Sequence, residues 1–185
     1  LLNDSGYYVT YEGDERPPGS QKHPVQLNPI AYLPMPDLAK KGTPAEVAWE
    51  HRYDLTRQAY EPKTLGWTFG EFALTSCRMH SPVEFARDLE AIQPGRFADP
   101  RWIQFYESSF WEGWHLNKSY YFPMMALYLQ AFTDVLVQDW TGNVELFGCI
   151  LPGWRTRDIE FHGIRSLGGC IVSGEFNGGS GKAEI

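Results

Sequence analysis

The segment from Phe122 to Gln138 constrains the fold more than any other part of this sequence. Its opening Phe122-Pro123 favours a helix start, because proline suits the first turn of a helix. The residues that follow are apolar on nearly every side of that helix. Such a helix must be enclosed by protein on all sides. The segment therefore predicts an inner helix of a large helical assembly.

The composition argues against two kinds of partner, a lipid bilayer and nucleic acid. The apolar run of this segment is interrupted by Gln130, Thr133 and Asp134, and it falls short of the roughly 20 apolar residues that cross a bilayer. No membrane span is therefore expected. The chain carries 16 basic and 23 acidic residues without a basic stripe, so nucleic acid is not an expected partner.

Three further helices are predicted upstream. The segment Thr43-Pro44-Ala45-Glu46 has the pattern of a capping box with proline in the first turn, which predicts a helix to about Tyr60. Gly66 to Met79 predicts a second helix. Ser81-Pro82-Val83-Glu84 repeats the capping pattern for a third, which ends near Ile92. The result is paired helices joined by a short link.

The pattern changes to short β-rich runs after Thr141-Gly142-Asn143. Runs at 144–147, 159–161 and 170–176 predict strands, and Asn177-Gly178-Gly179 predicts a hairpin turn with a returning strand from Lys182. Three or four strands leave edges open and apolar faces uncovered. We expect the missing strands to belong to other sequence.

The amino-terminal part predicts an extended loop, because six of the 13 prolines fall in residues 1–43. We expect this loop to pack on the rest through Ile30, Tyr32, Leu33 and Met35. The chain thus divides into a packed Pro-rich loop over 1–43, a helical part over 44–140 and a β part over 141–185. The class is α+β.

The chain opens with Leu1-Leu2 and shows no initiator methionine and no targeting segment. We therefore expect it to be a fragment of a larger protein. Its three cysteines are too few and too widely spaced for a dense disulfide scaffold or a CxxC motif, and buried free thiols are the simplest interpretation. These cysteines are Cys77, Cys149 and Cys170. No cofactor or metal is expected.

Two segments resemble the carboxyl-terminal end of six-hairpin glycosidases. Val144 to Trp154 is similar to a strand of the type I-x-L-L-P-A-L-P-x-x-W, through Leu151-Pro152 and Trp154. Phe161 to Ser173 is similar to a segment of the type G-L-R-A-R-G-G-F-x-V. These segments resemble family 95 glycoside hydrolases, the α-L-fucosidase and α-L-galactosidase group.

The resemblance implies late helices of an (α/α)6 toroid followed by the beginning of an antiparallel β-sandwich. It also implies a carbohydrate substrate, the remainder of the same polypeptide or a partner chain as a structural partner, and a secreted or periplasmic location. Family members place a catalytic carboxylate in an I-D-G-N-F-G loop just before the final inner helix. The nearest counterpart here is Glu112-Gly113, and equating the two requires an insertion.

Glu112 is the first catalytic candidate, because it combines an ionisable group with nearby aromatic and polar side chains. The neighbours that we expect to bind substrate are Trp111, Trp114, His115 and Asn117. The structural alternative is that the two tryptophans anchor a loop to the core and Glu112 is solvated or pairs with Lys118.

Glu71 is the second catalytic candidate. It lies in Trp67-Thr-Phe-Gly-Glu71-Phe72, an apolar helical segment, where burial would raise its pKa and suit a general acid. Trp67 is a further candidate for substrate binding. Exposure of Glu71 is the simpler alternative.

Glycoside hydrolysis needs one carboxylic acid and one carboxylate beside the scissile bond. The leading prediction is therefore a glycoside hydrolase in which this chain supplies one wall of the cleft. A non-catalytic carbohydrate-binding or scaffold component is the first alternative. A polysaccharide lyase on the same toroid, which would rely on Tyr and His, is the second.

Overall fold

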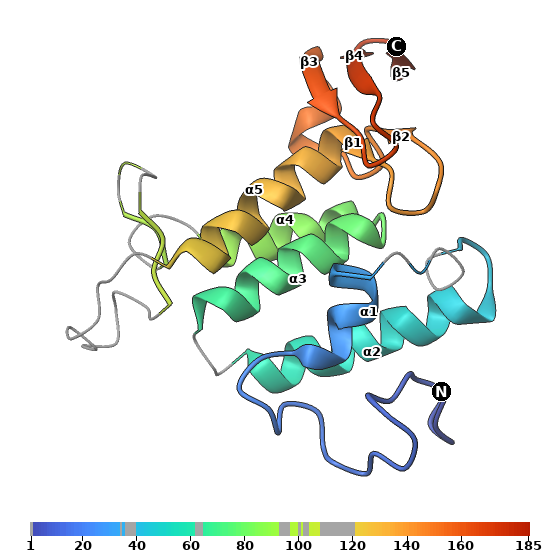
Figure 1. Ribbon diagram of the computed structural model, residues 1–185, viewed down its shortest axis with the longest axis vertical. Coiled ribbons are helices and arrows are strands. Elements are labelled where there is room, and N and C mark those ends of the chain that lie inside the picture. Colours follow the sequence, from blue (N-terminus) through green and yellow to red (C-terminus); the bar gives the residue numbers. More distant parts are fainter. Residues whose placement is uncertain are drawn as a thin grey trace.

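The computed structural model describes residues 2–33, 35, 40–61, 65–92, 97–99, 101, 104–107 and 121–185. Five α-helices precede two small antiparallel sheets in this part of the chain (Figure 1). The α+β class is therefore confirmed. The described residues form neither a toroid nor a β-sandwich.

The helices are α1 (Asn28–Ala31), α2 (Pro44–Tyr60), α3 (Gly66–Arg78), α4 (Pro82–Ala91) and α5 (Phe122–Leu136), with short 3-10 turns η1 (Val25–Leu27) and η4 (Pro152–Trp154). The strands are β1 (Val137–Gln138), β2 (Glu145–Leu146), β3 (Ile159–Arg165), β4 (Ile171–Asn177) and β5 (Lys182–Glu184). No helix among the described residues combines the length and the apolar character that crossing a bilayer requires.

Helix α2 begins where the capping pattern predicts. The Thr43 hydroxyl accepts a hydrogen bond from the amide of Glu46 at 3.3 Å, while the Glu46 carboxylate accepts one from the amide of Gly42 at 2.6 Å. The capping prediction for Ser81 is wrong. Its hydroxyl donates to the carbonyl of Met79 at 3.4 Å and makes no cap, although α4 still begins at Pro82.

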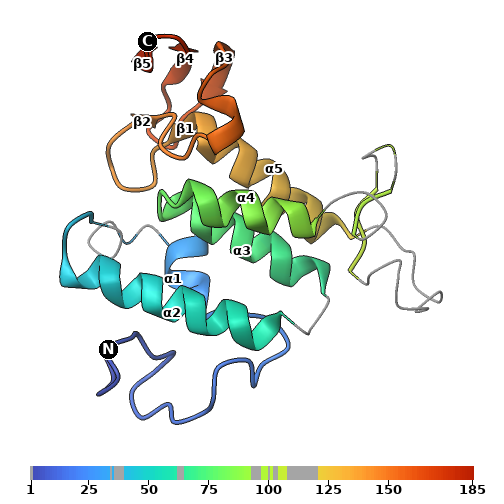
Figure 2. The same cartoon turned by 180° about the vertical axis from the view of Figure 1, so that it is seen from behind.

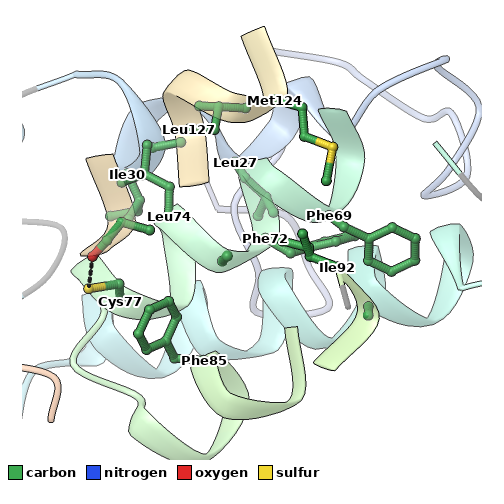
Figure 3. Close-up of a cluster of buried hydrophobic side chains, with 14 of the residues drawn as sticks. Leu27, Ile30, Phe69, Phe72, Leu74, Cys77, Phe85, Ile92, Met124 and Leu127 are labelled. Atoms are coloured by element: carbon green, nitrogen blue, oxygen red, sulfur yellow. Dashed lines mark hydrogen bonds between the residues drawn. The ribbon is translucent and has the colours of Figure 1, made fainter. Parts of the chain in front are cut away.

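Helix α3 is the most enclosed element. It packs against α1, α4 and α5 (Figures 1 and 2), and side chains from η1, α1, α3, α4 and α5 meet around it in one cluster (Figure 3). Helices α3 and α5 run parallel, since Gly70 lies against Leu127 and the Cys77 thiol donates to the carbonyl of Ala131, further along both helices.

Helix α5 is only partly enclosed. One face packs against α3, but Phe122 is 71% exposed and Leu129 is 54% exposed on another. The prediction that this helix is covered on every side is therefore not met within the described residues. The enclosed helix is α3, in which Gly66 and Gly70 leave room for a close neighbour.

The amino-terminal part is less extended than predicted. Residues 25–31 form η1 and α1, because Pro29 falls in the first turn of α1, where its missing amide costs no hydrogen bond. Leu27 and Ile30 are fully buried. Tyr32, Leu33 and Met35 stay substantially exposed, so the expected packing holds for Ile30 alone among the four predicted residues.

The β part contains the predicted hairpin. Strand β4 pairs with β3 on one side and β5 on the other, and Asn177 opposes Lys182 across the turn. Strand β3 runs further than predicted, past an irregularity between Phe161 and Ile164 where Gly163 adopts a φ of 71°. Phe161, Val172 and Phe176 form a second small core with residues from β1 and the segment after β2.

Candidate carboxylate site at the start of helix α3

Five of the seven predicted site residues lie outside the described residues. They are Trp111, Glu112, Trp114, His115 and Asn117. The two that the structure describes, Trp67 and Glu71, lie one turn apart in the first half of α3. The indole Nε1 of Trp67 donates a hydrogen bond to Oε2 of Glu71 at 3.1 Å.

Glu71 is buried, with only 1% of its surface exposed. The alternative that it is exposed is therefore wrong, because α3 is covered around most of its circumference and leaves no solvated face for an acid. Desolvation raises the pKa of Glu71 to about 8, against the opposing effect of the Trp67 hydrogen bond. Its second oxygen, Oε1, is buried without a hydrogen-bond partner among the described residues.

A second carboxylate, Glu107, joins the site at the amino-terminal end of α3. Its Oε2 accepts a hydrogen bond from the backbone amide of Trp67 at 2.9 Å, and its carbonyl accepts one from the amide of Gly66 at 2.6 Å. A carboxylate at this position is stabilised by the free amides and the dipole of the helix. Trp67 therefore contacts both glutamates, through its backbone and through its indole.

Two basic residues face the other oxygen of Glu107. Lys22 Nζ lies 3.4 Å and His23 Nε2 lies 3.6 Å from Oε1. Burial, followed by the charge of Lys22, lowers the pKa of His23 to about 4, so this imidazole is neutral near pH 7. Lys22 is thus the cation that balances Glu107. Glu107 Oε1 forms no hydrogen bond among the described residues, so Lys22 acts on it by charge alone. No cation in the described part of the chain contacts the carboxyl group of Glu71.

Aromatic rings pack against Trp67, the residue that contacts both carboxyl groups. The Tyr121 ring meets the Trp67 ring edge-on at 6.3 Å, and the His23 ring lies 5.7 Å from it. Desolvation, then the charge of Glu107, raises the pKa of Tyr121. Flat apolar faces therefore lie beside the Trp67 indole, which donates to Glu71.

The segment 97–107 positions Glu107. Ala98 and Phe105 form an isolated antiparallel bridge, and the Tyr106 amide donates to the carbonyl of Phe97 at 2.8 Å. This segment lies beside the amino-terminal ends of α3 and α5 (Figure 1). The sequence gives no signal for Glu107, because Phe105-Tyr106-Glu107 matches no motif and its position depends on this backbone pairing.

The remaining described surface offers no comparable constellation. Among the residues that the structure describes, no group of three or more His, Cys, Asp or Glu side chains could hold a metal ion. A cavity of about 600 Å³ on the β3-β4-β5 sheet is lined by Glu160, Glu175, Lys182 and neighbouring residues. Its polar lining is surface-exposed, and we assign it no chemistry.

Comparisons of this chain with protein-family models, with curated proteins and with solved structures found no match. The roles that follow from the resemblance to family 95 glycoside hydrolases therefore enter as proposals.

Proposed function

We propose that this chain supplies one wall of the active site of a glycoside hydrolase, with Glu71 as the general acid. The observation that carries the proposal is the buried carboxyl group of Glu71, whose pKa is raised to about 8 and whose Oε1 has no described partner. A glycosidase acid must hold a proton at the working pH and present it to the leaving oxygen. The raised pKa of Glu71 supports the first property, and the second is part of the proposal.

Glu107 is the described candidate for the second carboxylate. Its Oε2 accepts a hydrogen bond from the Trp67 amide at 2.9 Å, and its Oε1 lies 3.4 Å from Lys22 Nζ. Two carboxyl groups in contrasting surroundings are the arrangement that separates acid and base roles. The family resemblance favours Glu112 for the same role, so the experiment below tests both.

The aromatic rings suit a carbohydrate substrate. The apolar faces of a sugar ring stack on aromatic side chains, and the Trp67 indole that donates to Glu71 meets the Tyr121 ring edge-on. Helices α3 and α5 run parallel, and α4 lies between them in the sequence. This order is consistent with the helical hairpins that the resemblance implies.

The experiment compares the glutamine variants of Glu71, Glu107 and Glu112 on a panel of chromogenic aryl glycosides, α-L-fucosides and galactosides included. We expect Glu71→Gln to lower kcat/KM by about 10²–10⁴-fold, because the proton donor is lost. Of Glu107→Gln and Glu112→Gln, the variant that removes the second catalytic carboxylate should lower kcat/KM at least as much. Glu90→Gln, on the exposed face of α4, is the matched control.

The pH profile provides a second measurement. Because the acid must be protonated, kcat/KM should fall as the pH rises through the Glu71 pKa of about 8. Full turnover by a folded Glu71→Gln variant, or an unchanged alkaline limb in a variant with residual activity, would exclude Glu71 as the acid.

A carbohydrate-binding role without catalysis is the second candidate, and the aromatic rings favour it. In that case the protein binds oligosaccharides, which a titration followed by tryptophan fluorescence would detect, but releases no reducing ends. The Trp67→Ala change should then weaken binding, while Glu71→Gln should not. A lyase would instead release unsaturated uronic acids, detectable by their ultraviolet absorbance.

A further inference from the structure

The carboxyl-terminal end of α3 holds a pair of buried thiols. Cys77 lies in the last turn of α3 and Cys149 lies in the segment that follows β2, and neither exposes any surface. The Cys149 thiol lies 4.0 Å from the carbonyl oxygen of Ser76, the residue next to Cys77. The two cysteines are therefore neighbours in space although 71 residues separate them in sequence.

Contacts on both sides fix the backbone of this pair. The ring Nδ1 of His80 lies 3.1 Å from the carbonyl oxygen of Gly148. A Cβ atom on Gly148 would approach the His80 ring to 2.8 Å, so this ring packs directly against the backbone of Gly148. The side-chain amide of Gln138 donates to the carbonyl of Cys77 at 3.1 Å and lies 3.8 Å from its sulfur.

The proximity of Cys149 also affects the pKa of Cys77. Desolvation raises the pKa of the Cys77 thiol, and the hydrogen bond and charge of the Cys149 side chain raise it further. Asp134 adds to this effect and Arg78 opposes it. Cys170 is exposed and belongs to the β part, so it does not compete for either partner.

We propose that Cys77 and Cys149 form a disulfide bond when the protein folds in an oxidising environment. In this reaction each thiol loses its proton, and one thiolate attacks a small-molecule disulfide such as oxidised glutathione to form a mixed disulfide. The second thiolate then displaces the small thiol. The two protein sulfurs lose two electrons together, and the glutathione disulfide is reduced to two thiols.

The surroundings determine when the bond forms. Burial and a raised pKa keep the thiolate form of Cys77 scarce in the folded protein, and the thiolate is the reactive species. The bond must therefore form during folding, before α3 and the 147–150 segment close over the pair. Once formed, it joins the helical part to the β part and shortens the free loop of the unfolded chain.

The experiment is oxidative refolding of the intact protein from denaturant in a buffer of reduced and oxidised glutathione. Free thiols are then alkylated with iodoacetamide under denaturing conditions, with and without prior reduction, and each cysteine is assigned by peptide mass spectrometry. We expect Cys170 to be alkylated in both samples. Cys77 and Cys149 should be alkylated only after reduction, and a Cys77–Cys149 linked peptide should be found.

Variants provide matched controls. Cys170→Ser should leave the linked peptide unchanged, whereas Cys149→Ser should abolish it and free Cys77 for alkylation. In the Cys170→Ser background we expect reduction to lower the Tm by at least about 4 °C, as loss of a long-loop cross-link should.

The alkylation experiment on the wild-type protein can be interpreted even if the cysteine variants fail to fold. Full alkylation of Cys77 and Cys149 in the refolded, unreduced protein would overturn the proposal, and so would a linkage through Cys170. These outcomes are independent of glycoside turnover, so the assignment of Glu71 is unaffected by either.

Discussion

At the scale of single residues, Asp88 is a buried carboxylate with hydrogen-bond partners on both oxygens. One of its carboxylate oxygens accepts hydrogen bonds from Tyr53 at 2.5 Å and Ser76 at 2.8 Å, and the other accepts one from Arg57 at 2.9 Å. Desolvation raises the pKa of Asp88, and these three partners oppose the rise. The network joins α2, α3 and α4 at one carboxylate.

We expect Asp88→Ala to destabilise the protein by about 3–5 kcal/mol, because it leaves the Arg57 guanidinium buried without its counter-ion. Tyr53→Phe removes one donor and should cost only about 1 kcal/mol. Urea unfolding of both variants measures the difference. Equal costs for the two changes would show that the ion pair does not dominate the network.

Residue chemistry was only partly predictable from sequence. Glu71 stands out as an acid among apolar residues, but its burial depends on how α1, α4 and α5 surround α3, which a single helix pattern does not encode. Glu107 carries no local signal at all. It reaches the site because residues 97–99 pair with residues 104–106 and the Glu107 carboxylate meets the start of α3.

At the scale of elements, Gly66 controls how the 97–107 segment meets α3. A Cβ atom at this position would lie 2.6 Å from the sulfur of Met124 and closer still to the carbonyl oxygen of Tyr106. Gly66 has an ordinary helical backbone, so its requirement is for space and not for an unusual φ. The residue therefore sets the approach of Glu107 to Trp67.

We expect Gly66→Ala to destabilise the protein by about 1–3 kcal/mol through overpacking and to lower glycoside turnover by displacing Glu107. Gly153→Ala is the matched control, because Gly153 has open space around it and should change stability by less than about 0.5 kcal/mol. Thermal unfolding and kcat/KM of the two variants provide the comparison. A Gly66→Ala protein as stable and active as Gly153→Ala would contradict this account.

The elements themselves were largely predictable. Local signals predicted the starts of α2 and α4 and the β4-β5 hairpin, since the Thr43 cap, proline in the first turn of both helices and Asn-Gly act over a few residues. Helix α3 was predicted without such a signal at its start. The packing around α5 was not predictable, because an apolar pattern shows that a helix favours burial but does not show which residues cover it. The apolar stripe of Phe122 and Leu129 remains open in the described residues.

At the scale of the whole molecule, two hydrophobic clusters meet at one tryptophan. Trp154 packs against both the helical cluster and the β cluster, and its ring lies 5.9 Å from that of Phe132 in α5. His80 adds a polar link, with Nε2 3.3 Å from a carboxylate oxygen of Glu145 in β2. Local changes in either part are therefore expected to affect a shared unfolding transition.

The ionisation of Glu71 should appear in that transition as a dependence of stability on pH. The pKa of Glu71 is 4.5 in its ordinary state and about 8 in the fold, so between these values the native protein binds one more proton than the unfolded chain. Stability contributed by the protonated form is complete below about pH 4.5. It declines as the pH rises towards 8 and is lost above it.

Glu71→Gln keeps a neutral side chain at all pH values and is the reference for this effect. Between about pH 5 and pH 8 the free energy of unfolding of the wild type should fall relative to the variant by about 1.4 kcal/mol per pH unit, and the two should run parallel above it. Urea unfolding of both proteins across this pH range measures the difference between their free energies of unfolding. The contributions of the other titrating groups are the same in both proteins and cancel in this difference. Parallel curves throughout would mean that Glu71 ionises normally, and its unpaired oxygen would then have to be solvated.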